Sequence, residues 1–409
     1  MLVKVDLFAD EFFDSPWDLY HRLLKDAPVL YAEDLDFYLI SRYDDVRAAC
    51  ANWRVFSSAH GTIIDQLNTP DFATQSIPGA VFNYDPPDHS RLRRLVAPTF
   101  THQAVAGLDD AIRHAVNKYL EPQRDRETFD FFKDFAQPLP AEVMFNLMGV
   151  PPADREHLVE LFELFMHVEE GVDYDVAAAK RAAAVEELAA YFGELATWKL
   201  DHLGDDIVSH VIQSSYVDEE GNEQVLRDAE LTGFLLFLTA GGVETTSRLL
   251  SSTLVTLQRH PVQWQKLRDD PTKIAAAFEE GGRFESPVQY LGRRCMSDTT
   301  IQGVTIPAAA NVLLLIGAAN RDPRAFSNPD EFDIERDLTT LVPLTFSFGP
   351  HICLGMHLAR RQVQTAFGEI LQRWPDLEVI EEGLVRTKDI HLMGWSSVPV
   401  SVSARESVG

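Results

Sequence analysis

The sequence predicts an α+β fold that is mostly α-helical, in a single domain spanning residues 1–409, and three observations support this. Helical patterns dominate residues 87–257, whereas short strand-like segments gather near the N-terminus and beyond residue 285. Apolar residues make up 45% of the 409, which is enough for a large core. Because the chain contains neither an internal repeat nor a low-complexity linker, helices and strands are expected to share that core.

The first expected elements are short. A helix should open at Ser15-Pro16-Trp17, with serine as its cap and proline in its first turn. Residues 29–32 and 37–41 predict two strands around a turn, and a helix should follow near residues 43–51. Residues 57–84 lack a regular pattern, and a long irregular segment in a compact protein is often a functional lid.

Long helices are expected in the middle of the chain. A Gly-Val-Pro-Pro sequence at residues 149–152 separates two of them, and the Ala- and Glu-rich residues 172–200 predict another. Asp228 is expected to cap a very long helix that runs to about His260, where Pro261 stops it.

The last third of the chain has a mixed character. Residues 321–337 show no period and predict a packed loop, and a last long helix should run from Cys353 or Leu354 to about Arg373. Short strands are expected at residues 286–287, 304–307, 311–315 and 398–402.

The chain is strongly acidic, with a formal net charge of −27. Such a chain repels phosphate backbones, which argues against nucleic-acid binding and against a general affinity for anionic membranes. The N-terminus matches neither a signal peptide nor an anchor, and the best apolar run, residues 231–238, is too short to span a bilayer. Three widely spaced cysteines, Cys50, Cys295 and Cys353, fit no disulfide framework. We therefore expect a cytoplasmic protein without a membrane anchor.

The surroundings of Cys353 indicate more than a small buried apolar residue, which is the ordinary role of a lone cysteine. Cys353 stands at the start of the last expected helix, where unpaired backbone N–H groups stabilise an anion and favour the thiolate. Gly349 and Gly355 bracket the cysteine, and each permits a tight backbone or a flat object pressed against it. The segment therefore predicts a site that presents a thiolate to something planar or bulky.

This segment resembles the haem-binding signature of the cytochrome P-450 family, in which all fixed positions are filled here: Phe346, Gly349, His351, Cys353 and Gly355. By this resemblance Cys353 is the ligand to the iron of haem b, His351 hydrogen-bonds a haem propionate, and Phe346 packs beside the thiolate and shields it. Thiolate ligation favours cleavage of the O–O bond. The resemblance thus implies a soluble bacterial-type haem-thiolate monooxygenase.

A second motif lies on the long helix, from Gly241 and Gly242 to Glu244, Thr245 and Thr246. Two glycines in a helix interior cost about 1 kcal/mol each and a buried glutamate costs more, so a merely flexible spot in a core helix is the weaker interpretation. A threonine can bond back to the preceding turn and open the helix locally. The motif resembles the family's oxygen-binding groove, which implies that Glu244 and Thr245 are the catalytic acid–alcohol pair that relays protons from solvent.

A third motif is the pair Glu280 and Arg283, which meet on one helix face. Alone, such a pair is usually solvated. Together with the first two motifs, the pair resembles the family's Glu-x-x-Arg element. This resemblance implies a structural ion-pair network with a later arginine, here Arg336. Gly281 and Gly282 stand where the family often has bulky apolar residues, so this helix is expected to be weak or kinked.

Three further basic residues are expected to bind the haem propionates. His89 and Arg93 are four apart on one helix face, after the Asp-Pro-Pro-Asp sequence at residues 85–88 that the family usually has, although a basic solvent-facing surface is the alternative. Arg293 matches the family's third propionate ligand, but Arg294 beside it leaves the register open by one residue. Two buried carboxylates need such partners.

The resemblance implies the family's triangular helical prism with small β-sheets, and haem between the long central helix and the helix after Cys353. Substrate would lie above the haem, under a lid formed by residues 61–82 and the helix pair around residues 162–168. Ordinary core packing is the alternative at each lining position. The candidate lining predicts a small or medium apolar substrate and consists of Phe237, Ala240, Gly241, Val288, Gln289, Leu291, Met393 and Trp395.

No flavin or iron–sulfur segment is present in the sequence. Electrons from NAD(P)H are therefore expected to arrive through a ferredoxin or similar small carrier and its reductase. Arg91, Arg94, Arg360 and Arg361 are the expected docking patch on an otherwise acidic surface. The chain is expected to act as a monomer and to insert one atom of O2 by hydroxylation or O-dealkylation, with phenol coupling as a variant that the sequence does not separate.

Two other functions are weighed against this one. A peroxide-driven enzyme of the same fold commonly lacks the acid–alcohol pair, and turnover on peroxide alone would distinguish it. A haem-dependent sensor or ligand-binding protein needs no proton relay and usually carries an output module, which is not visible in the sequence.

Overall fold

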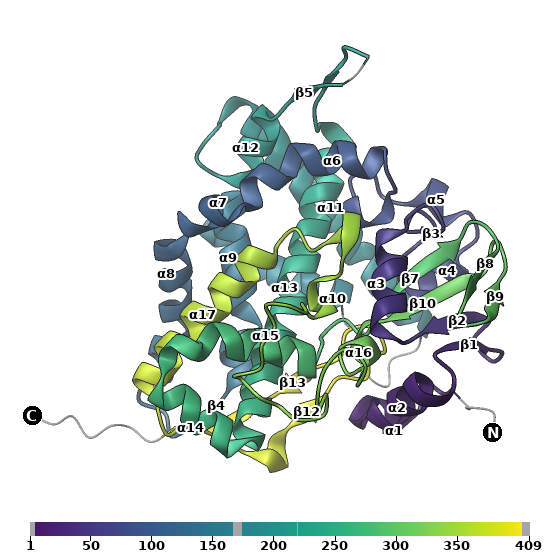
Figure 1. The fold of residues 1–409 in the computed structure, drawn as a ribbon. Helices are drawn as coiled ribbons and strands as arrows, with labels where there is room; N and C mark the ends of the chain where they lie inside the picture. The colour runs from purple at the N-terminus through teal and green to yellow at the C-terminus, as the bar shows by residue number, and fades with distance from the viewer. Residues whose placement is uncertain (1–4, 167–173, 219, 403–409) are drawn as a thin grey trace, which may run out of the picture.

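The computed structural model describes residues 5–166, 174–218 and 220–402, and helices form most of it (Figure 1). The α-helices are α1 (Asp10–Asp14), α2 (Trp17–Asp26), α3 (Tyr43–Ala51), α4 (Ile64–Asn68), α5 (Phe72–Gln75), α6 (Asp88–Val96), α7 (His102–Ala106), α8 (Asp109–Leu120), α9 (Pro138–Met148), α10 (Arg155–Met166), α11 (Tyr174–Asp201), α12 (Ile207–Gln213), α13 (Asp228–Arg259), α14 (Pro261–Asp269), α15 (Ile274–Phe284), α16 (Ile316–Ala319) and α17 (Met356–Arg373). Shorter turns used below are the 3-10 helices η1 (Val81–Asn83) and η8 (Gly349–His351) and the π-helical turn η4 (Phe132–Ala136).

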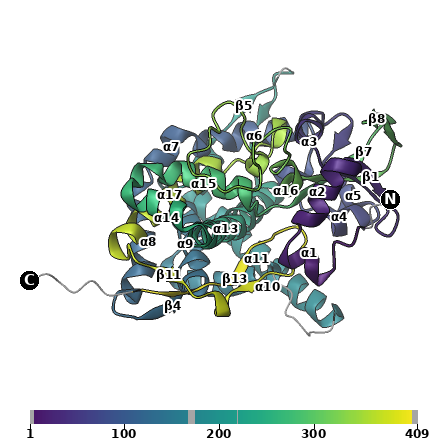
Figure 2. The ribbon, with the colours of Figure 1, turned by 60° about the horizontal axis from the view of Figure 1, so that its bottom comes forward.

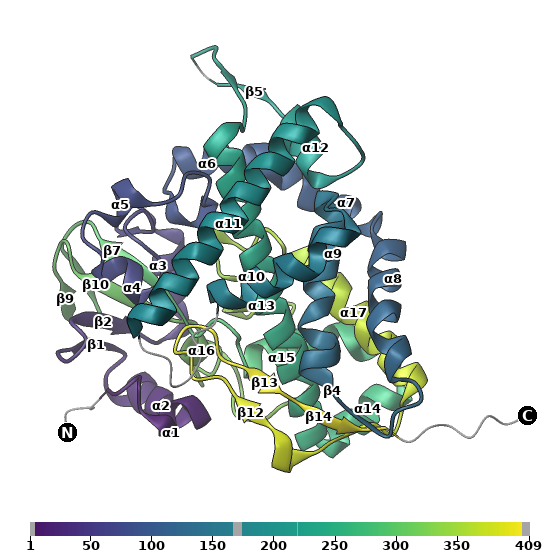
Figure 3. The same ribbon diagram turned by 180° about the vertical axis from the view of Figure 1, so that it is seen from behind.

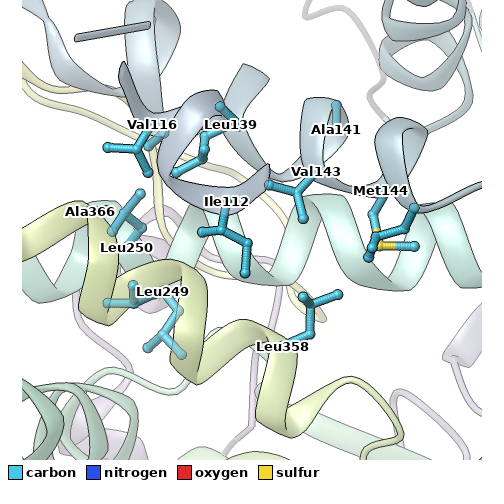
Figure 4. Close-up of a cluster of buried hydrophobic side chains, with 14 of the residues drawn as sticks. Ile112, Val116, Leu139, Ala141, Val143, Met144, Leu249, Leu250, Leu358 and Ala366 are labelled. Carbon is cyan, nitrogen blue, oxygen red and sulfur yellow. The ribbon is translucent and has the colours of Figure 1, made fainter. Parts of the chain in front are cut away.

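The long helix α13 runs through the middle of the molecule and packs against α9, α11, α15 and α17 (Figure 1). Figure 4 shows part of this core, where Ile112 of α8, Val143 of α9, Leu250 of α13 and Leu358 of α17 lie together, all of them buried. Truncating one such side chain to alanine costs about 2–5 kcal/mol. The core therefore fixes α13, which carries the Gly241–Thr246 motif, relative to α17, which directly follows the cysteine motif.

A five-stranded sheet lies beside the helical body, in the order β1-β2-β10-β7-β3. Strands β2 and β10 run parallel, with Leu39 opposite Leu313, and the other neighbours are antiparallel. Alternating side chains point to opposite faces, so Leu313 packs with α2 and α4 while Leu314 packs with α3 and α16. The strands are β1 (Val29–Ala32), β2 (Phe37–Ile40), β3 (Phe56–Ser57), β7 (Tyr290–Cys295) and β10 (Asn311–Leu315).

The other strands form small sheets. Figures 2 and 3 show the C-terminal strands along one edge of the helical body, away from the five-stranded sheet. The three-stranded sheet has the order β11 (Glu378–Val379), β14 (Pro399–Ser401), β4 (Thr128–Asp130), and the hairpins are β5 (Tyr216–Val217) with β6 (Glu223–Gln224), β8 (Thr299–Ile301) with β9 (Val304–Ile306), and β12 (Val385–Arg386) with β13 (Trp395–Ser397).

The structure confirms a mostly helical α+β fold, but it corrects both expected helix caps. Ser15 does not cap α2, because α2 starts at Trp17 and Pro16 occupies its cap position, while the N–H of Ser15 donates to the carbonyl of Glu11 at the end of α1. Asp228 is already the first residue of α13, and no side-chain cap bond is formed at that end.

Other observed element boundaries also differ from the expected ones. Residues 286–287 form no strand, since β7 begins at Tyr290, and α17 begins at Met356, after the cysteine loop. The segment expected to be an irregular lid contains the short helices α4 and α5. Of the second lid segment, α10 is described to Met166, and residues 167 and 168 lie outside the described residues.

Candidate active site

Cys353 lies in the loop between η8 and α17, and its side chain faces open space. Protein on the other sides of the sulfur buries it, and this burial raises the pKa of the Cys353 thiol. Backbone N–H groups of Gly355 and Met356 at the start of α17, with the charges of Arg93 and Arg360, act in the opposite direction. Because a bound metal cation deprotonates a coordinating thiol, these groups are arranged to support a metal-bound thiolate.

The loop that carries Cys353 is closed by its own backbone. The N–H of Cys353 donates to the carbonyl of Phe346 at 2.9 Å. Gly349 has a φ of +73°, and a Cβ there would lie 2.8 Å from the Cα of Ala51, so the position requires glycine. The ring of Phe346 lies 6.1 Å from the ring of Phe278 on α15, and this contact connects the loop to that helix.

Two glycines border open space, as a flat group would require. A Cβ added to Gly241 of α13 or to Gly355 would meet no atom within 4 Å. Gly241 is exposed, although Ala240 and Glu244 on the same helix are buried. This room beside the backbone suits a planar ligand held by the cysteine loop.

Four basic side chains converge beside the same loop: His89 and Arg93 of α6, Arg293 of β7, and His351 of η8. The rings of His89 and His351 lie 4.3 Å apart between centroids. Both ring nitrogens of His89 are buried and have no hydrogen-bond partner. Burial, assisted by Arg93, lowers the pKa of His89 to about 4, and burial with the neighbouring cations holds the pKa of His351 well below its usual range.

This cluster fits the two carboxylates of a haem. Buried polar nitrogens without a partner and buried guanidinium groups are unfavourable unless anionic acceptors complete them. The structure also favours one of the two possible arginines. Arg293 is buried at 2% exposure within the cluster, whereas Arg294 points away and donates to the carbonyls of Ala309 and Leu67.

The Gly241–Thr246 motif lies in an uninterrupted part of α13, so the expected local opening of the helix is not present. The hydroxyl of Thr245 donates to the carbonyl of Gly241 at 2.7 Å, one turn earlier. A Cβ on Gly242 would lie 3.2 Å from the sulfur of Met144. The two glycines therefore have different roles, since one leaves open space and the other lets α9 pack closely.

Glu244 is buried and forms an ion pair with Arg248, one turn later on α13. The Nε of Arg248 donates to a carboxylate oxygen at 2.8 Å, and an Nη of the same guanidinium donates to that oxygen as well. Arg248 was missed in the sequence. Its spacing of four from Glu244 was the available signal, but an arginine in a helix is more often on the surface.

Glu280, Arg283 and Arg336 form the expected network. Arg283 donates to both oxygens of Glu280 at 2.7 and 2.8 Å, and the Nε of Arg336 donates to the same carboxylate at 3.1 and 3.2 Å. The expected weakness of this helix is wrong, because α15 continues unbroken to Phe284. Its two glycines permit close packing, since a Cβ on Gly281 would lie 2.5 Å from the Thr253 hydroxyl and one on Gly282 would lie 2.8 Å from a methyl group of Thr345.

The structure divides the expected substrate lining into two groups. Phe237 meets Phe82 of η1 edge-on, with ring centroids 5.1 Å apart, and Ala240 lines a small cavity next to Glu244. Gln289 instead belongs to the core, since it accepts from the Tyr20 hydroxyl at 2.9 Å and donates to the carbonyl of Ser286 at 2.5 Å. Core packing also surrounds Met393, Trp395 and Leu291, and Val288 forms a backbone bridge with Leu392.

The expected docking patch is largely neutralised. Three of its four arginines form ion pairs, and the fourth, Arg94, lies with its guanidinium 5.4 Å from the ring of Tyr216. The pairs are Arg91–Glu230, Arg360–Glu279 at 2.6 Å and Arg361–Asp109.

Comparison with known proteins agrees with this geometry. A family model described as Cytochrome P450 matches residues 17–402. The chain is 31% identical over 401 residues to a putative cytochrome P450 123 of Mycobacterium tuberculosis, covering 98% of this chain and 97% of that protein. The solved structure of CYP109Q5 from Chondromyces apiculatus is similar, with a TM-score of 0.88 and 27% identity over 98% of this chain and 99% of that one. CYP109E1 from Bacillus megaterium, solved in complex with corticosterone, is similar with a TM-score of 0.85 and 27% identity over 96% and 100% of the two chains.

The chain therefore belongs to the cytochrome P450 family, the haem-containing enzymes of monooxygenase type. This confirms the fold expected from the signature around Cys353. Among the residues that the structure describes, no helix is both long and apolar enough to cross a membrane.

Proposed function

We propose that this enzyme inserts one atom of O2 into a small or medium apolar substrate, by hydroxylation or O-dealkylation. In this proposal the thiolate of Cys353 would bind the iron of haem b, and His89, Arg93, Arg293 and His351 would bind the two haem carboxylates. Glu244 and Thr245 supply protons, and the electrons come from NAD(P)H through separate proteins.

One observation carries the proposal. His89 is 2% exposed, both of its ring nitrogens are without a partner, and its ring lies 4.3 Å from the ring of His351, tilted by 48°, two residues before the cysteine. A buried imidazole left in this state is expected to have an acceptor that completes it. A ligand that presents carboxylates to this cluster and a metal to Cys353 satisfies both sites together.

When bound through a thiolate, haem supplies the cleavage of the O–O bond and the transfer of one oxygen atom. The protein supplies the protons. The hydroxyl of Thr245 donates to the carbonyl of Gly241, and when it turns it would donate its proton into the open space beside Gly241 instead. Its oxygen would then accept a replacement proton that entered through Glu244. Glu244, the preceding residue, faces the cavity and takes up protons from water there.

The residues that remain in the candidate lining are apolar. Phe82 and Phe237 make an edge-to-face pair, and Ala240 and Gly241 add no polar side-chain atom. Apolar pockets select ligands by shape and by the water that they release. The corticosterone bound to the Bacillus megaterium relative supports an apolar substrate of up to steroid size.

Electrons are proposed to come from a ferredoxin-type carrier and its reductase. The exposed Arg94 is the part of the expected docking patch that the ion pairs described above leave available. A cytoplasmic location is part of the same proposal, supported by three free cysteines, two of them buried.

The proposal is tested by titrating the haem-loaded protein with terpenoids, alkyl and methoxy aromatics, and steroids while its visible spectrum is recorded. We expect a high-spin shift with one apolar class, and oxygenated product when that compound is supplied with NAD(P)H, ferredoxin and reductase. Turnover on peroxide without reductant would instead support the peroxide-driven alternative.

Ligation is tested with a matched pair of cysteine variants. Cys353→Ser should lose the spectrum of a thiolate-bound carbon monoxide complex. Cys295→Ser, at a buried cysteine that donates to the Ser297 carbonyl, should retain it. Thiolate ligation that persists in Cys353→Ser would overturn the assignment.

A further inference from the structure

Glu244 and Arg248 form a buried ion pair on α13. They lie on a different face of that helix from the face that borders open space. Gly241 and Thr245, four residues apart, share the face that borders open space. Ala240, Glu244 and Arg248 share the next face, where Ala240 and Glu244 line a cavity. The carboxylate that the proposed function uses is therefore held on a different side of the helix from the hydroxyl of Thr245.

Arg248 is fixed at three points besides Glu244. Its Nη1 donates to the carbonyl of Trp395 on β13 at 2.5 Å, and its guanidinium lies 4.8 Å from the centre of the Phe132 ring of η4. Its aliphatic stem lies against Gly394, where a Cβ would come within 2.7 Å of the Cδ of Arg248. At 1% exposure it is among the largest fully buried side chains described. A guanidinium bound in this way has little freedom to leave the carboxylate.

The cavity beside Glu244 reaches an exposed hydrogen-bonded pair. Its lining includes Gln137 and Glu163, whose side chains are joined by a 2.9 Å bond from the Gln137 amide nitrogen. Gln137 directly follows the π-helical turn, where its N–H donates to the carbonyl of Phe132. The same turn thus presents Phe132 to Arg248 and Gln137 to the cavity. Such turns are frequent at functional sites.

We propose that Arg248 is a positioning residue that holds Glu244 as a carboxylate at the inner end of this cavity, anchored by the Trp395 carbonyl, so that proton supply to Thr245 depends on Arg248. This inference rests on the proposed function. The charged side chains that contact Glu244 or share its cavity include Arg248 and Glu163. The positive charge of Arg248 favours the ionised form of Glu244, whereas the negative charge of Glu163 in the same cavity lining opposes it.

The physical consequence concerns the charge of Glu244. A buried carboxylate that loses its partner is costly, and it takes up a proton instead of remaining charged. A neutral Glu244 no longer collects protons from cavity water and no longer keeps its fixed orientation. Removing Arg248 should therefore change the protonation state of Glu244 and leave the cysteine loop unchanged.

The test uses the haem-loaded protein and its infrared spectrum at neutral pH. Arg248→Met should show a new band of a protonated carboxylic acid, which the parent and the double variant Arg248→Met/Glu244→Gln lack. Product formed per electron consumed should fall by about 100-fold, the lower end of the range for loss of a positioned acid–base group. Arg248→Lys should show no such band and should recover most of the coupling.

A control separates this effect from the loss of any buried ion pair. Lys199 and Asp206 form a buried pair at 2.5 Å on α11 and at the start of α12, so Lys199→Met should lower stability without altering coupling or the carboxyl band. If Arg248→Met fails to fold, Arg248→Gln, which can still donate to the Trp395 carbonyl, is expected to show the same band.

The outcomes are distinguishable from failure of the proposed function. An unchanged infrared spectrum in both neutral variants, or an equal loss of coupling in Lys199→Met, would overturn the role of Arg248. A new band that disappears with Glu244→Gln supports that role, even if the enzyme oxygenates none of the tested apolar compounds, in which case the proposed substrate class fails alone.

Discussion

Gly233 of α13 lies directly against the carbonyl of Pro78, so that a Cβ on Gly233 would come within 1.8 Å of that oxygen. The contact is mutual, since a Cβ on Gly79 would lie 2.0 Å from the carbonyl of Glu230. Two backbones thus cross without a side chain between them. This close backbone contact holds the end of segment 61–82, the expected lid, against the central helix α13.

Gly233→Ala should therefore push residues 77–79 away from α13. We expect a loss of about 1–3 kcal/mol in the free energy of unfolding, as for overpacking of a tight interior, and weaker binding of the substrate identified by titration. Gly368→Ala on α17 is the matched control, because its Cβ would meet no atom within 4 Å. The control should be neutral or stabilising by up to about 1 kcal/mol. Equal stability and affinity in Gly233→Ala and the parent would contradict the close backbone contact.

Glu280→Gln should strongly destabilise the protein. Glu280 is 1% exposed and accepts from two arginines, so a neutral amide leaves two guanidinium groups without their anion. We expect a loss of about 3–5 kcal/mol, measured by denaturant unfolding. Glu335→Gln, at an exposed carboxylate paired with Lys266 and Lys273, should cost no more than about 1 kcal/mol. Similar losses of unfolding free energy in the two variants would show that burial of the carboxylate does not determine the loss of stability.

Thr245→Ala should separate electron use from product formation. The variant keeps the residues proposed to hold haem but lacks the hydroxyl of residue 245, so product formed per electron should fall by at least about tenfold while substrate affinity is unchanged. Thr239→Ala is the control, because Thr239 also donates to the carbonyl one turn earlier, at 2.9 Å, but is fully buried elsewhere on α13. It should keep the coupling of the parent, and a matching decrease in both variants would exclude a special role for Thr245.

Acid should destabilise protein prepared without haem through His89. The pKa of His89 is about 4 in the folded chain, below the value of about 6.5 for an ordinary histidine. The unfolded chain therefore binds the proton at higher pH, and the stability present above pH ~6.5 is lost as the pH falls through about 4. Urea unfolding should show a smaller pH dependence in His89→Gln than in the parent.

Haem should weaken the same pH dependence. Carboxylates beside His89 favour its protonated form and oppose the effect of burial. His114→Gln, at an exposed histidine on α8, is the control and should keep the slope of the parent. Identical slopes with and without haem would argue against carboxylates at the cluster.

The sequence predicted those parts of the site whose chemistry is local. The residues around Cys353 and the Gly241–Thr246 segment are short patterns in which the backbone itself needs glycine or a helix end. Residues that are close in the sequence are therefore enough to indicate these parts of the candidate site. Long-range partners were harder. Whether Arg360 is free depends on Glu279, eighty-one residues away, and Gln289 is a core residue because of Tyr20.

The same reasoning explains the miss at Arg248. Its charge suggests a surface position, and only its contacts with Trp395 and Phe132 make burial tolerable. The expectation of a kink in α15 was wrong for a similar reason. The two glycines of that helix allow close packing against Thr253 and Thr345, which lie on other elements.

The parallel pairing of β2 with β10 has a consequence for how the molecule is made. Phe37 of β2 lies opposite Asn311, so the middle of the five-stranded sheet joins segments that are far apart in the chain. During synthesis the hairpin of β1 and β2 emerges with the inner edge of β2 unpaired, and its partner β10 follows only after most of the helical body. Non-local pairings of this kind form slowly, and unpaired edges attract other chains. The unpaired edge of β2 is therefore expected to need shielding until residue 315 has been translated.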